Sequence, residues 1–492
     1  MPISFPYENL DERERVLGAH YNSMVTALVA FFDGGLGGAD LEAPIVLGKA
    51  GQNLDGDGKY IHSFSRWFGG TSATSVKDVT GFGAVGDGST DDIEAIMDAI
   101  DDMPSTGGIL FFPPGTYLVG KAIQMMGRDP KHNRIDGVTI AGAGRSSVIK
   151  VKTGSDVTAI EMGQTARDMM VTNIRIDGNK SGQSTGYGLH GISAENTWNC
   201  LITGCWIDFI QGVGIEVRHA INLTISNCFI NGTTKAGIRH HTGGERGDGL
   251  IISACTINTP GDPSNAIEGE GIRLIPCPRK AVISGCTVED SWGNGIIVST
   301  SDSQNCDNIS ITGNTVTNSG RALGSVTSTG IVVASPYAGL RAGKVTITGN
   351  FVELSDTDGI RVIASDGGDI QGFTVSSNVV TNNDENGIFV GESTHGSVCA
   401  NSVQDNGQDA GGSSREGIRI IGATDNETQY VSISSNGVFD SQGSPTQQIG
   451  IHTLSTSKDC VVVGNSVRNN AVQDILDEGI DNDIAHNTED PA

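Results

Sequence analysis

The chain is 492 residues long, with 69 Gly, only 5% aromatic residues, and 57 acidic against 31 basic side chains, which give a formal charge of −26. A charge this negative repels nucleic-acid phosphates and anionic membrane surfaces, so we expect no nucleic-acid partner and no membrane insertion. The length exceeds one ordinary globular core, and the composition favours a stack of short strands joined by tight turns.

The first segment, residues 1–70, differs in character from the rest of the chain. Residues 8–32 have the pattern of a helix, and a Gly-rich break then leads into strands around an Asp-Gly turn. The segment does not show a basic start followed by an apolar run, so we expect no cleavable secretory signal. It is too small for a large core, so we predict an attachment or oligomerisation segment.

Residues 71–137 are predicted to cap the repeats that begin at residue 138. The sequence GGILFFPPGTYLV at 107–119 predicts two short strands around a Pro-Gly turn. We expect a helix that covers the open end of a β-stack, where exposed strand edges would invite aggregation. This helix is indicated by polar residues that suit a helix start, followed by apolar residues at helical spacing: Thr90, Asp91 and Asp92, then Ile93, Ile96, Met97 and Ile100.

From residue 138 onwards the sequence repeats itself with two motifs. The first is typified by ITGCWI at 202–207 and ISNCFI at 225–230, and the second by GIEV at Gly214 and GIRH at Gly237. One position of the first motif recurs at intervals of 23 to 36 residues, which fits one turn of a coil of parallel strands with variable loops. We therefore predict an all-β fold, a right-handed parallel β-helix (a solenoid) over residues 138–492.

One small residue recurs at the same place in each repeat and predicts a column along the solenoid axis. Stacked Asn amides can bond to one another in such a column, and Cys fills a similar space. Cys residues strung along an axis do not converge tetrahedrally, so we predict no metal site and no cofactor. The nine Cys are read as buried free thiols of a protein made in a reducing cytosol. The column consists of Cys205, Cys228, Cys255, Cys286, Asn314, Asn350, Asn378, Asn401, Asn436 and Asn465.

Three segments carry a resemblance to a known family: FGAVGDGSTDD at 82–92, GGILFFPPGTYLV at 107–119 and VTIAGAGRSSVIKV at 138–151. They resemble the N-terminal region of the pectate lyase superfamily, in the branch found in phage tailspikes, polygalacturonase-like glycosidases and alginate epimerases. The sequence NLDGDGKYIHSF at 53–64 is similar to an element that often follows the virion anchor in tailspike and tail fibre proteins.

The resemblance implies a phage tailspike, a receptor-binding protein that forms a homotrimer in the virion tail after synthesis in the host cytoplasm. Residues 1–70 would bind a phage tail or baseplate protein, and the β-helix would recognise, or recognise and degrade, a host cell-surface polysaccharide. This scaffold carries several activities, so two alternatives stay open. One is a free bacterial polysaccharide hydrolase, lyase or epimerase, and the other is a non-catalytic glycan-binding adhesin.

Aligning the repeats on their Gly-Ile pairs places one residue of each repeat on the outer face of the solenoid. Adjacent rungs of a parallel sheet lie about 4.8 Å apart, so Glu216, Arg239 and Arg273 are expected to form a contiguous charged stripe. The aligned residues are Glu216, Arg239, Arg273, Ile297, Val332, Arg361, Phe389, Arg419 and His452.

A hydrolase would need two carboxyl groups a few ångströms apart, and we predict Glu216 together with Glu270 or Asp248 as that pair. Arg239 and Arg273 would bind the carboxylates of an acidic sugar. The alternative is that the Glu and Arg side chains only pair with one another as a solvated ladder.

A lyase or epimerase would need a base beside the sugar C5 and a group that neutralises the sugar carboxylate. His241 with Arg239 or Arg273 would serve, and Glu245 in the loop after His241 is predicted to contact substrate. Two family signatures are missing from the sequence: a run of Asp on successive coils for calcium, and an Asp-Pro-His-Glu tetrapeptide. Their absence weakens the calcium-dependent lyase and epimerase alternatives.

Trp206 and Phe229 occupy equivalent positions on successive coils. If they face outward, their rings provide a platform for sugar faces, and Asp208 provides a hydrogen-bond partner for hydroxyl groups. The alternative is that both rings lie in a trimer interface, because an exposed apolar stripe on a long solenoid is usually covered.

Overall fold

The structure is a computed structural model that describes most of the chain from Val76 onwards. The predictions for residues 1–70, and the role of Glu245, lie outside the described residues. In the part of the chain that is described, no helix is both long and apolar enough to cross a membrane. The described ranges are 76–125, 136–163, 166–184, 189–241, 247–258, 260–261, 269–301, 303–320, 328–409 and 414–489.

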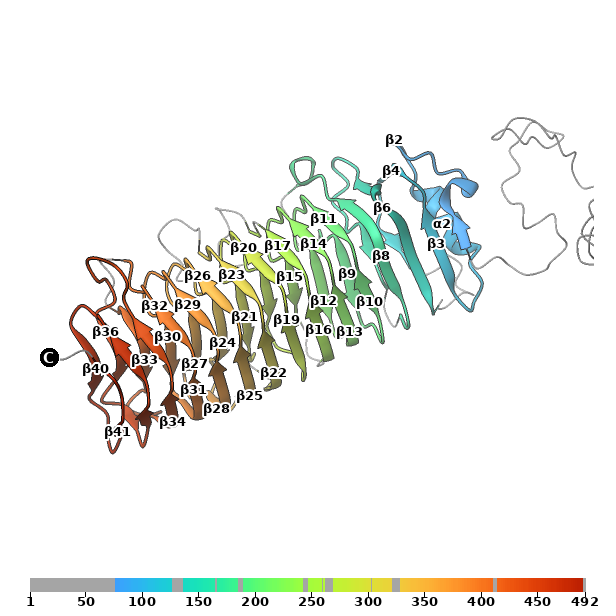
Figure 1. Cartoon of the computed structure of the whole chain (residues 1–492). Coiled ribbons are helices and arrows are strands. Elements are labelled where there is room, and N and C mark those ends of the chain that lie inside the picture. The colour runs from blue at the N-terminus through green and yellow to red at the C-terminus, as the bar shows by residue number, and fades with distance from the viewer. Residues whose placement is uncertain are drawn as a thin grey trace, which may run out of the picture. The chain divides into compact units, whose positions relative to one another are not determined.

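The strands wind into a coil in which each turn contributes three short strands (Figure 1). One turn consists of β10 (Leu201–Thr203), β11 (Trp206–Asp208) and β12 (Ile215–Arg218). The corresponding strands of the next turn pair with these three in parallel and in register. The prediction of an all-β parallel β-helix is therefore confirmed.

One face of the coil is a parallel sheet of 13 described strands, called here the 13-stranded sheet. Its strands follow one another along the axis in sequence order. They are β5 (Ile123–Gln124), β7 (Ile160–Glu161), β9 (Ile192–Glu195), β12, β15 (Ile238–His240), β18 (Ile272–Leu274), β21 (Ile296–Ser299), β24 (Ile331–Ser335), β27 (Ile360–Ala364), β30 (Ile388–Gly391), β33 (Glu416–Ile421), β36 (Ile449–Thr453) and β40 (Gln473–Asp477).

The other two faces form one sheet of 28 described strands, because the long strands β6 (Val138–Val151) and β8 (Met170–Asp177) run through both. The first of these faces contains β1 (Val76–Asp78), β3 (Gly108–Phe112), β10, β13 (Ile221–Ser226), β16 (Asp248–Ser253), β19 (Ala281–Ser284), β22 (Cys306–Thr312), β25 (Arg341–Thr348), β28 (Asp369–Ser376), β31 (Ser393–Cys399), β34 (Thr428–Ser434), β37 (Ser457–Lys458), β38 (Val461–Val463) and β41 (Asp483–Ala485). The second contains β2 (Asp87–Asp91), β4 (Gly115–Val119), β11, β14 (Phe229–Asn231), β17 (Thr256–Asn258), β20 (Thr287–Glu289), β23 (Thr315–Thr317), β26 (Phe351–Glu353), β29 (Val379–Thr381), β32 (Ser402–Gln404), β35 (Gly437–Phe439) and β39 (Ser466–Arg468).

The core is a set of stacked aliphatic side chains, since alternate residues of each strand point inward. Ile202, Ile225 and Ile252 lie on successive turns in matching register, and none is exposed to solvent. Close packing requires the glycine before each Ile of the second motif. A Cβ atom placed on Gly271 would lie 2.2 Å from Cγ1 of Val288, so a larger residue would collide with the core.

The predicted helix is α2 (Ile93–Asp101), and Figure 1 shows it beside the first strands of the coil. It is accompanied by the short 3-10 helix η2 (Val79–Phe82). The polar residues expected at the helix start are present there, and the carboxylate of Asp91 accepts from the N–H of Ile93 (3.4 Å). Asp92 is the N-cap residue, but its carboxylate accepts hydrogen bonds from the backbone N–H groups of Val85 (2.6 Å) and Gly86 (3.2 Å) instead of capping α2. Shielding of the open strand edges by the helix stays a prediction.

The predicted column of Cys and Asn is confirmed, and it continues one turn further, to Asn487. The amide Nδ2 of Asn350 donates to Oδ1 of Asn378 (2.9 Å), and Asn378 donates in the same way to Asn401 (3.0 Å). At the other end of the ladder Asn465 donates to Asn487 (2.9 Å). All nine Cys are free thiols, and all but Cys399 are buried. Because the amides bond along the axis, the ladder links every turn that it crosses.

Asn378→Ala tests the strength of this ladder. The substitution removes the acceptor for the backbone N–H of Asn350 and the donor to Ile347 O, both of which are buried. A buried polar group without a partner costs about 1–3 kcal/mol, so we expect Asn378→Ala to lower the free energy of unfolding by about 3 kcal/mol in urea titrations. The control is Gln371→Ala, because Gln371 is exposed. An equal decrease in its free energy of unfolding would contradict the role given to the buried ladder.

Candidate functional site

The outer column predicted from the Gly-Ile alignment is confirmed by the strand register. Glu216 of β12 pairs with Arg239 of β15, which pairs with Arg273 of β18. The same column continues through Ile297, Val332, Arg361, Phe389, Arg419 and His452. These residues alternate with core positions, so the column lies on the outer side of the 13-stranded sheet.

Glu216 is the centre of an ion-pair cluster in this column. Its Oε2 lies 2.7 Å from Nε of Arg239 on the next turn, and its Oε1 lies 3.2 Å from Nε of Arg218 on the same strand. The Glu216 residue is 0% exposed, whereas the Arg218 side chain is 40% exposed. The expected pairing of Glu and Arg is therefore present, but Glu216 is buried and not solvated as a simple surface ladder would require.

The second carboxylate, Glu270, holds Arg273 within the same turn. Glu270 Oε1 lies 2.5 Å from Nη1 of Arg273, and the Glu270 residue is 2% exposed. Glu216 and Glu270 belong to turns that are separated by the turn of β15, which places them about 10 Å apart along the axis.

Three further predicted site residues lie on the other sheet. Asp248 is the first residue of β16 and pairs with Ile221 in the 28-stranded sheet. Trp206 and Asp208 belong to β11 of the same sheet. The Asp208 carboxylate is paired with Arg175 (2.8 Å), and the Trp206 ring is partly buried. The structure thus brings together Glu216, Arg239, Glu270 and Arg273, and it places Asp248, Trp206 and Asp208 on a different sheet.

His241 comes directly after β15 and lies beside this cluster. Desolvation of the imidazole lowers the pKa of His241, the charges of Arg239, Arg218 and Arg273 lower it further, and the Glu216 carboxylate opposes them. The residue is nevertheless exposed. The imidazole is therefore held neutral at pH 7 next to several guanidinium groups, the state that a general base requires.

Two further histidines near the cluster are buried. Burial lowers the pKa of both His190 and His240 to about 4, from the ordinary value of 6.5. Nδ1 of His240 lies 2.6 Å from the carbonyl oxygen of Pro276. Both rings are therefore neutral packing elements at pH 7.

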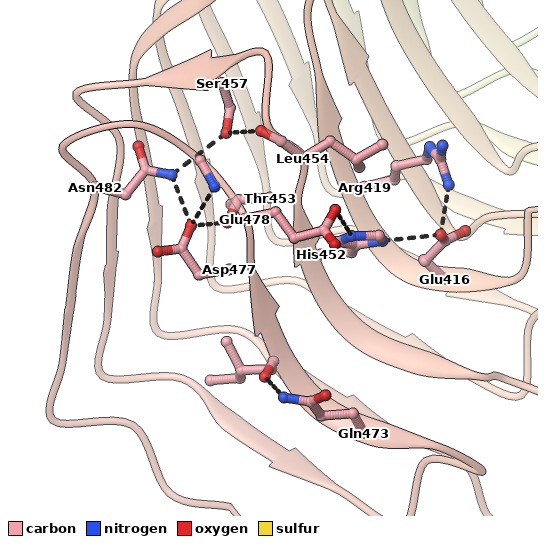
Figure 2. A network of polar contacts seen from close by, with 12 residues as sticks. Glu416, Arg419, His452, Thr453, Leu454, Ser457, Gln473, Asp477, Glu478 and Asn482 are labelled. Atoms are coloured by element: carbon pink, nitrogen blue, oxygen red, sulfur yellow. Dashed lines mark hydrogen bonds and ion pairs between the residues drawn. The ribbon is translucent and has the colours of Figure 1, made fainter.

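A second ionic cluster on the same sheet was missed by the sequence analysis. Glu416 Oε1 contacts Nη1 of Arg419 (2.5 Å) and Nδ1 of His452 (3.1 Å), and Nε2 of His452 lies 3.4 Å from Glu478 (Figure 2). Burial raises the pKa of Glu416, but the hydrogen bond from His452 and the charge of Arg419 outweigh it, so that the pKa lies below its usual value.

A signal for these pairs is present in the sequence. The pattern acid-Gly-Ile-Arg occurs at 270–273, 358–361 and 416–419, and each occurrence forms an ion pair between its first and last residue. The Gly-Ile alignment starts at the Gly and therefore does not include the acidic residue before it. Among the described residues, no group of three or more His, Cys, Asp or Glu side chains is arranged to hold a metal ion.

Comparisons with known proteins agree with the fold. Residues 76–162 match the family described as rhamnogalacturonase A/epimerase, pectate lyase-like, and residues 133–316 match the right-handed β-helix region. Together with the observed rungs, these matches make the chain a pectate lyase-like, right-handed parallel β-helix.

Within that class the chain is similar, over part of its length, to phage tail spikes and to mannuronan epimerases. The tail spike protein of Shigella phage Sf6 is 27% identical over 217 residues, which is 42% of this chain and 31% of that protein. Among solved structures, the Dettilon tailspike protein has a TM-score of 0.55 at 18% identity, covering 82% of this chain and 68% of that chain. The A-module of an Azotobacter vinelandii mannuronan C-5 epimerase has a TM-score of 0.52 at 19% identity, covering 84% of this chain and all of the module. The chain spans less than a third of the length of the curated relatives that it matches.

The buried histidines predict an acid-sensitive fold. The unfolded chain binds protons on these imidazoles below about pH 6.5, and the folded chain does so only near pH 4. Resistance to urea should therefore be greatest above pH 6.5 and decline as the pH falls towards 4, by up to about 3 kcal/mol for each ring. His240→Gln should show a shallower decline, and a slope equal to that of the wild type would contradict this assignment.

Proposed function

We propose that the protein is a receptor-binding spike of a phage tail that binds an acidic cell-surface polysaccharide of the host on the outer face of the 13-stranded sheet. Residues 1–70 would attach it to a tail or baseplate protein, and three copies would assemble into the spike. The likeness to a phage tail spike over 217 residues supports the setting. The arginines in the cluster around Glu216 and Glu270 support an acidic polysaccharide as the ligand.

The observation that carries the proposal is a set of arginines held in place by buried carboxylates. Arg218 and Arg273 have side chains that are 40% and 26% exposed, and each is paired with an almost fully buried Glu. A guanidinium has five N–H donors, so one ion pair leaves donors for a sugar carboxylate. The chain has a formal charge of −26, so an anionic polymer is repelled from most of its surface. Fixed arginines on one face therefore select where such a polymer binds.

Catalysis on the bound polymer, either cleavage or epimerisation, is the second candidate, and His241 favours it. A neutral, exposed imidazole beside Arg239 and Arg273 combines a base with groups that neutralise a sugar carboxylate, as a lyase or epimerase step requires. Hydrolysis by Glu216 with Glu270 is the other cleavage chemistry, whereas Asp248 begins a strand of the other sheet. In this proposal Glu245, Trp206 and Asp208 contribute to substrate binding.

The binding proposal predicts a selective effect of Arg273→Ala. Loss of a charge-assisted contact should weaken binding of acidic polysaccharide about tenfold. The matched control is Arg361→Ala, because Arg361 occupies the same column, pairs with Asp358 in the same way, and has a side chain 29% exposed against 26% for Arg273. Binding is measured by calorimetry against polygalacturonate, polymannuronate and purified Shigella surface polysaccharide. If both variants lose binding affinity equally, or if neither variant loses any, Arg273 is not part of the binding site.

The cleavage chemistries are separated by their products. Hydrolysis releases reducing ends without ultraviolet-absorbing unsaturated sugars, whereas a lyase releases both. Loss of unsaturated product in His241→Ala with unchanged binding would establish the lyase role. Loss of reducing ends in Glu216→Gln and Glu270→Gln would establish the hydrolase. A wild-type protein that binds, releases neither product and leaves the configuration at the sugar C5 unchanged by NMR is an adhesin, whereas inversion at C5 without cleavage identifies an epimerase.

The trimer is tested by sedimentation of the full chain, which should give a species of three copies. Trp206 and Phe229 pair on adjacent turns and are both partly buried within one chain. If these rings lie in the interface, replacing both with Ser should give monomers with unchanged circular dichroism. Trimers that persist in the double variant would place the interface elsewhere.

A further inference from the structure

The turn after each strand of the second face requires an unusual backbone conformation. We consider the described turns of this face from β11 onwards. In all of them except the turn after β35, the residue directly after the strand has a φ between +54° and +66°. Left-handed backbone suits Gly, Asn and Asp but crowds the Cβ of a bulky residue, at about 1–2 kcal/mol. The residues are Phe209, Gly232, Asp290, Asn318, Leu354, Asn382, Asp405 and Asn469.

Phe209 and Leu354 depart from this pattern. Both are bulky and apolar, yet Phe209 is 48% exposed and Leu354 is 52% exposed, so burial does not offset the backbone strain. Strained residues that the surrounding structure holds in place are frequent at ligand sites. The two residues differ in their surroundings, because Phe209 borders a pocket.

The pocket has a volume of about 520 Å³, within the range of about 300–1,000 Å³ that is usual for small-ligand sites. Its residues come from two adjacent turns of the coil. Asp177 ends β8, the 3-10 helix η3 (Lys180–Gly182) comes shortly after it, and Phe209 comes directly after β11. The lining residues are Asp177, Asn179, Lys180, Ser181, Phe209 and Gln211.

Backbone contacts hold this pocket in one shape. The N–H of Lys180 donates to Phe209 O (2.9 Å), and the side chain of Asn179 donates to Val151 O (3.1 Å). A Cβ atom on Gly232 would lie 3.2 Å from Cδ1 of Phe209, so glycine on the next turn leaves room for the ring. The carboxylate of Asp177 accepts from the N–H of Asn179 (2.9 Å), and Oε1 of Gln211 accepts from the hydroxyl of Thr234 (3.3 Å). The ring and these two polar groups are therefore positioned before any ligand arrives.

We propose that this pocket is a sugar-binding subsite that takes one pyranose residue of the polysaccharide. An aromatic ring can cover the apolar C–H face of a sugar, while carboxylate, amide and ammonium groups bond its hydroxyls. Asp177, Lys180 and Gln211 supply those polar groups. The subsite rests on the proposed function, and it lies on the turn that leads into β12, the strand that carries Glu216. A bound chain would thus contact the pocket and the arginine cluster in succession.

The test is Phe209→Asn in the full chain, with Leu354→Asn as the matched control. Asn adopts left-handed backbone readily, so both variants should unfold at the same temperature as the wild type or higher. We expect about tenfold weaker binding in Phe209→Asn and unchanged binding in Leu354→Asn. Binding is measured by calorimetry and saturation-transfer NMR with polygalacturonate, polymannuronate, maltohexaose and Shigella surface polysaccharide. Gln211→Ala provides a second variant that alters the pocket without changing the strained position.

The outcomes separate the subsite from the wider function. One outcome is that Phe209→Asn and Gln211→Ala bind as the wild type does, while Arg273→Ala binds more weakly. This outcome contradicts the proposed subsite but still supports polysaccharide binding. A lower unfolding temperature in Phe209→Asn, with binding intact, assigns the ring to packing and overturns the subsite as well. If the wild type binds none of the four probes, both the function and the subsite fail.

Discussion

The structure depends on parallel, in-register pairing between successive turns. Each residue lies about 4.8 Å from the residue at the same position of the next turn, so a position in the repeat becomes a column along the axis. Core isoleucines, Asn amides and outer charges are all stacked by this one constraint. The neighbours of a charged residue in a column are therefore the residues at the same position in the preceding and following repeats. Glu216, for example, has Arg239 as its neighbour on the next turn.

Burial of Glu216 shows how strongly the column governs the chemistry. A carboxylate that is 0% exposed is tolerated only if paired and hydrogen-bonded, and Arg239 and Arg218 supply this from the next turn and from the same strand. Glu270 achieves the same with Arg273 within one turn. The carboxylates hold the guanidinium groups rigidly at the surface, and a rigid donor loses less entropy when it binds an anionic ligand.

The sequence was sufficient to predict which residues share a column, because the Gly-Ile pair marks the same strand position in every repeat. It was not sufficient to predict burial, because burial depends on which side chains lie against one another, as Arg218 and Arg239 lie against Glu216. Glu216 was expected at the surface and is buried, and Asp248 was grouped with it although it begins a strand of the other sheet. Phe209 was missed for another reason: its left-handed backbone results from the turn geometry and leaves no mark in the motif itself.

Two ionic clusters share the outer column, and the state of their histidines distinguishes them. His452 is 8% exposed and has a carboxylate at each ring nitrogen, Glu416 and Glu478, so its hydrogen-bonding capacity is used within the protein. His241 is exposed, and partial desolvation of its ring, followed by the charges of the neighbouring arginines, lowers its pKa below the ordinary value. Between the clusters, Ile297 and Val332 interrupt the charges. The cluster of His452 therefore has the character of a closed structural network, and the cluster of His241 has the accessible groups that a ligand needs.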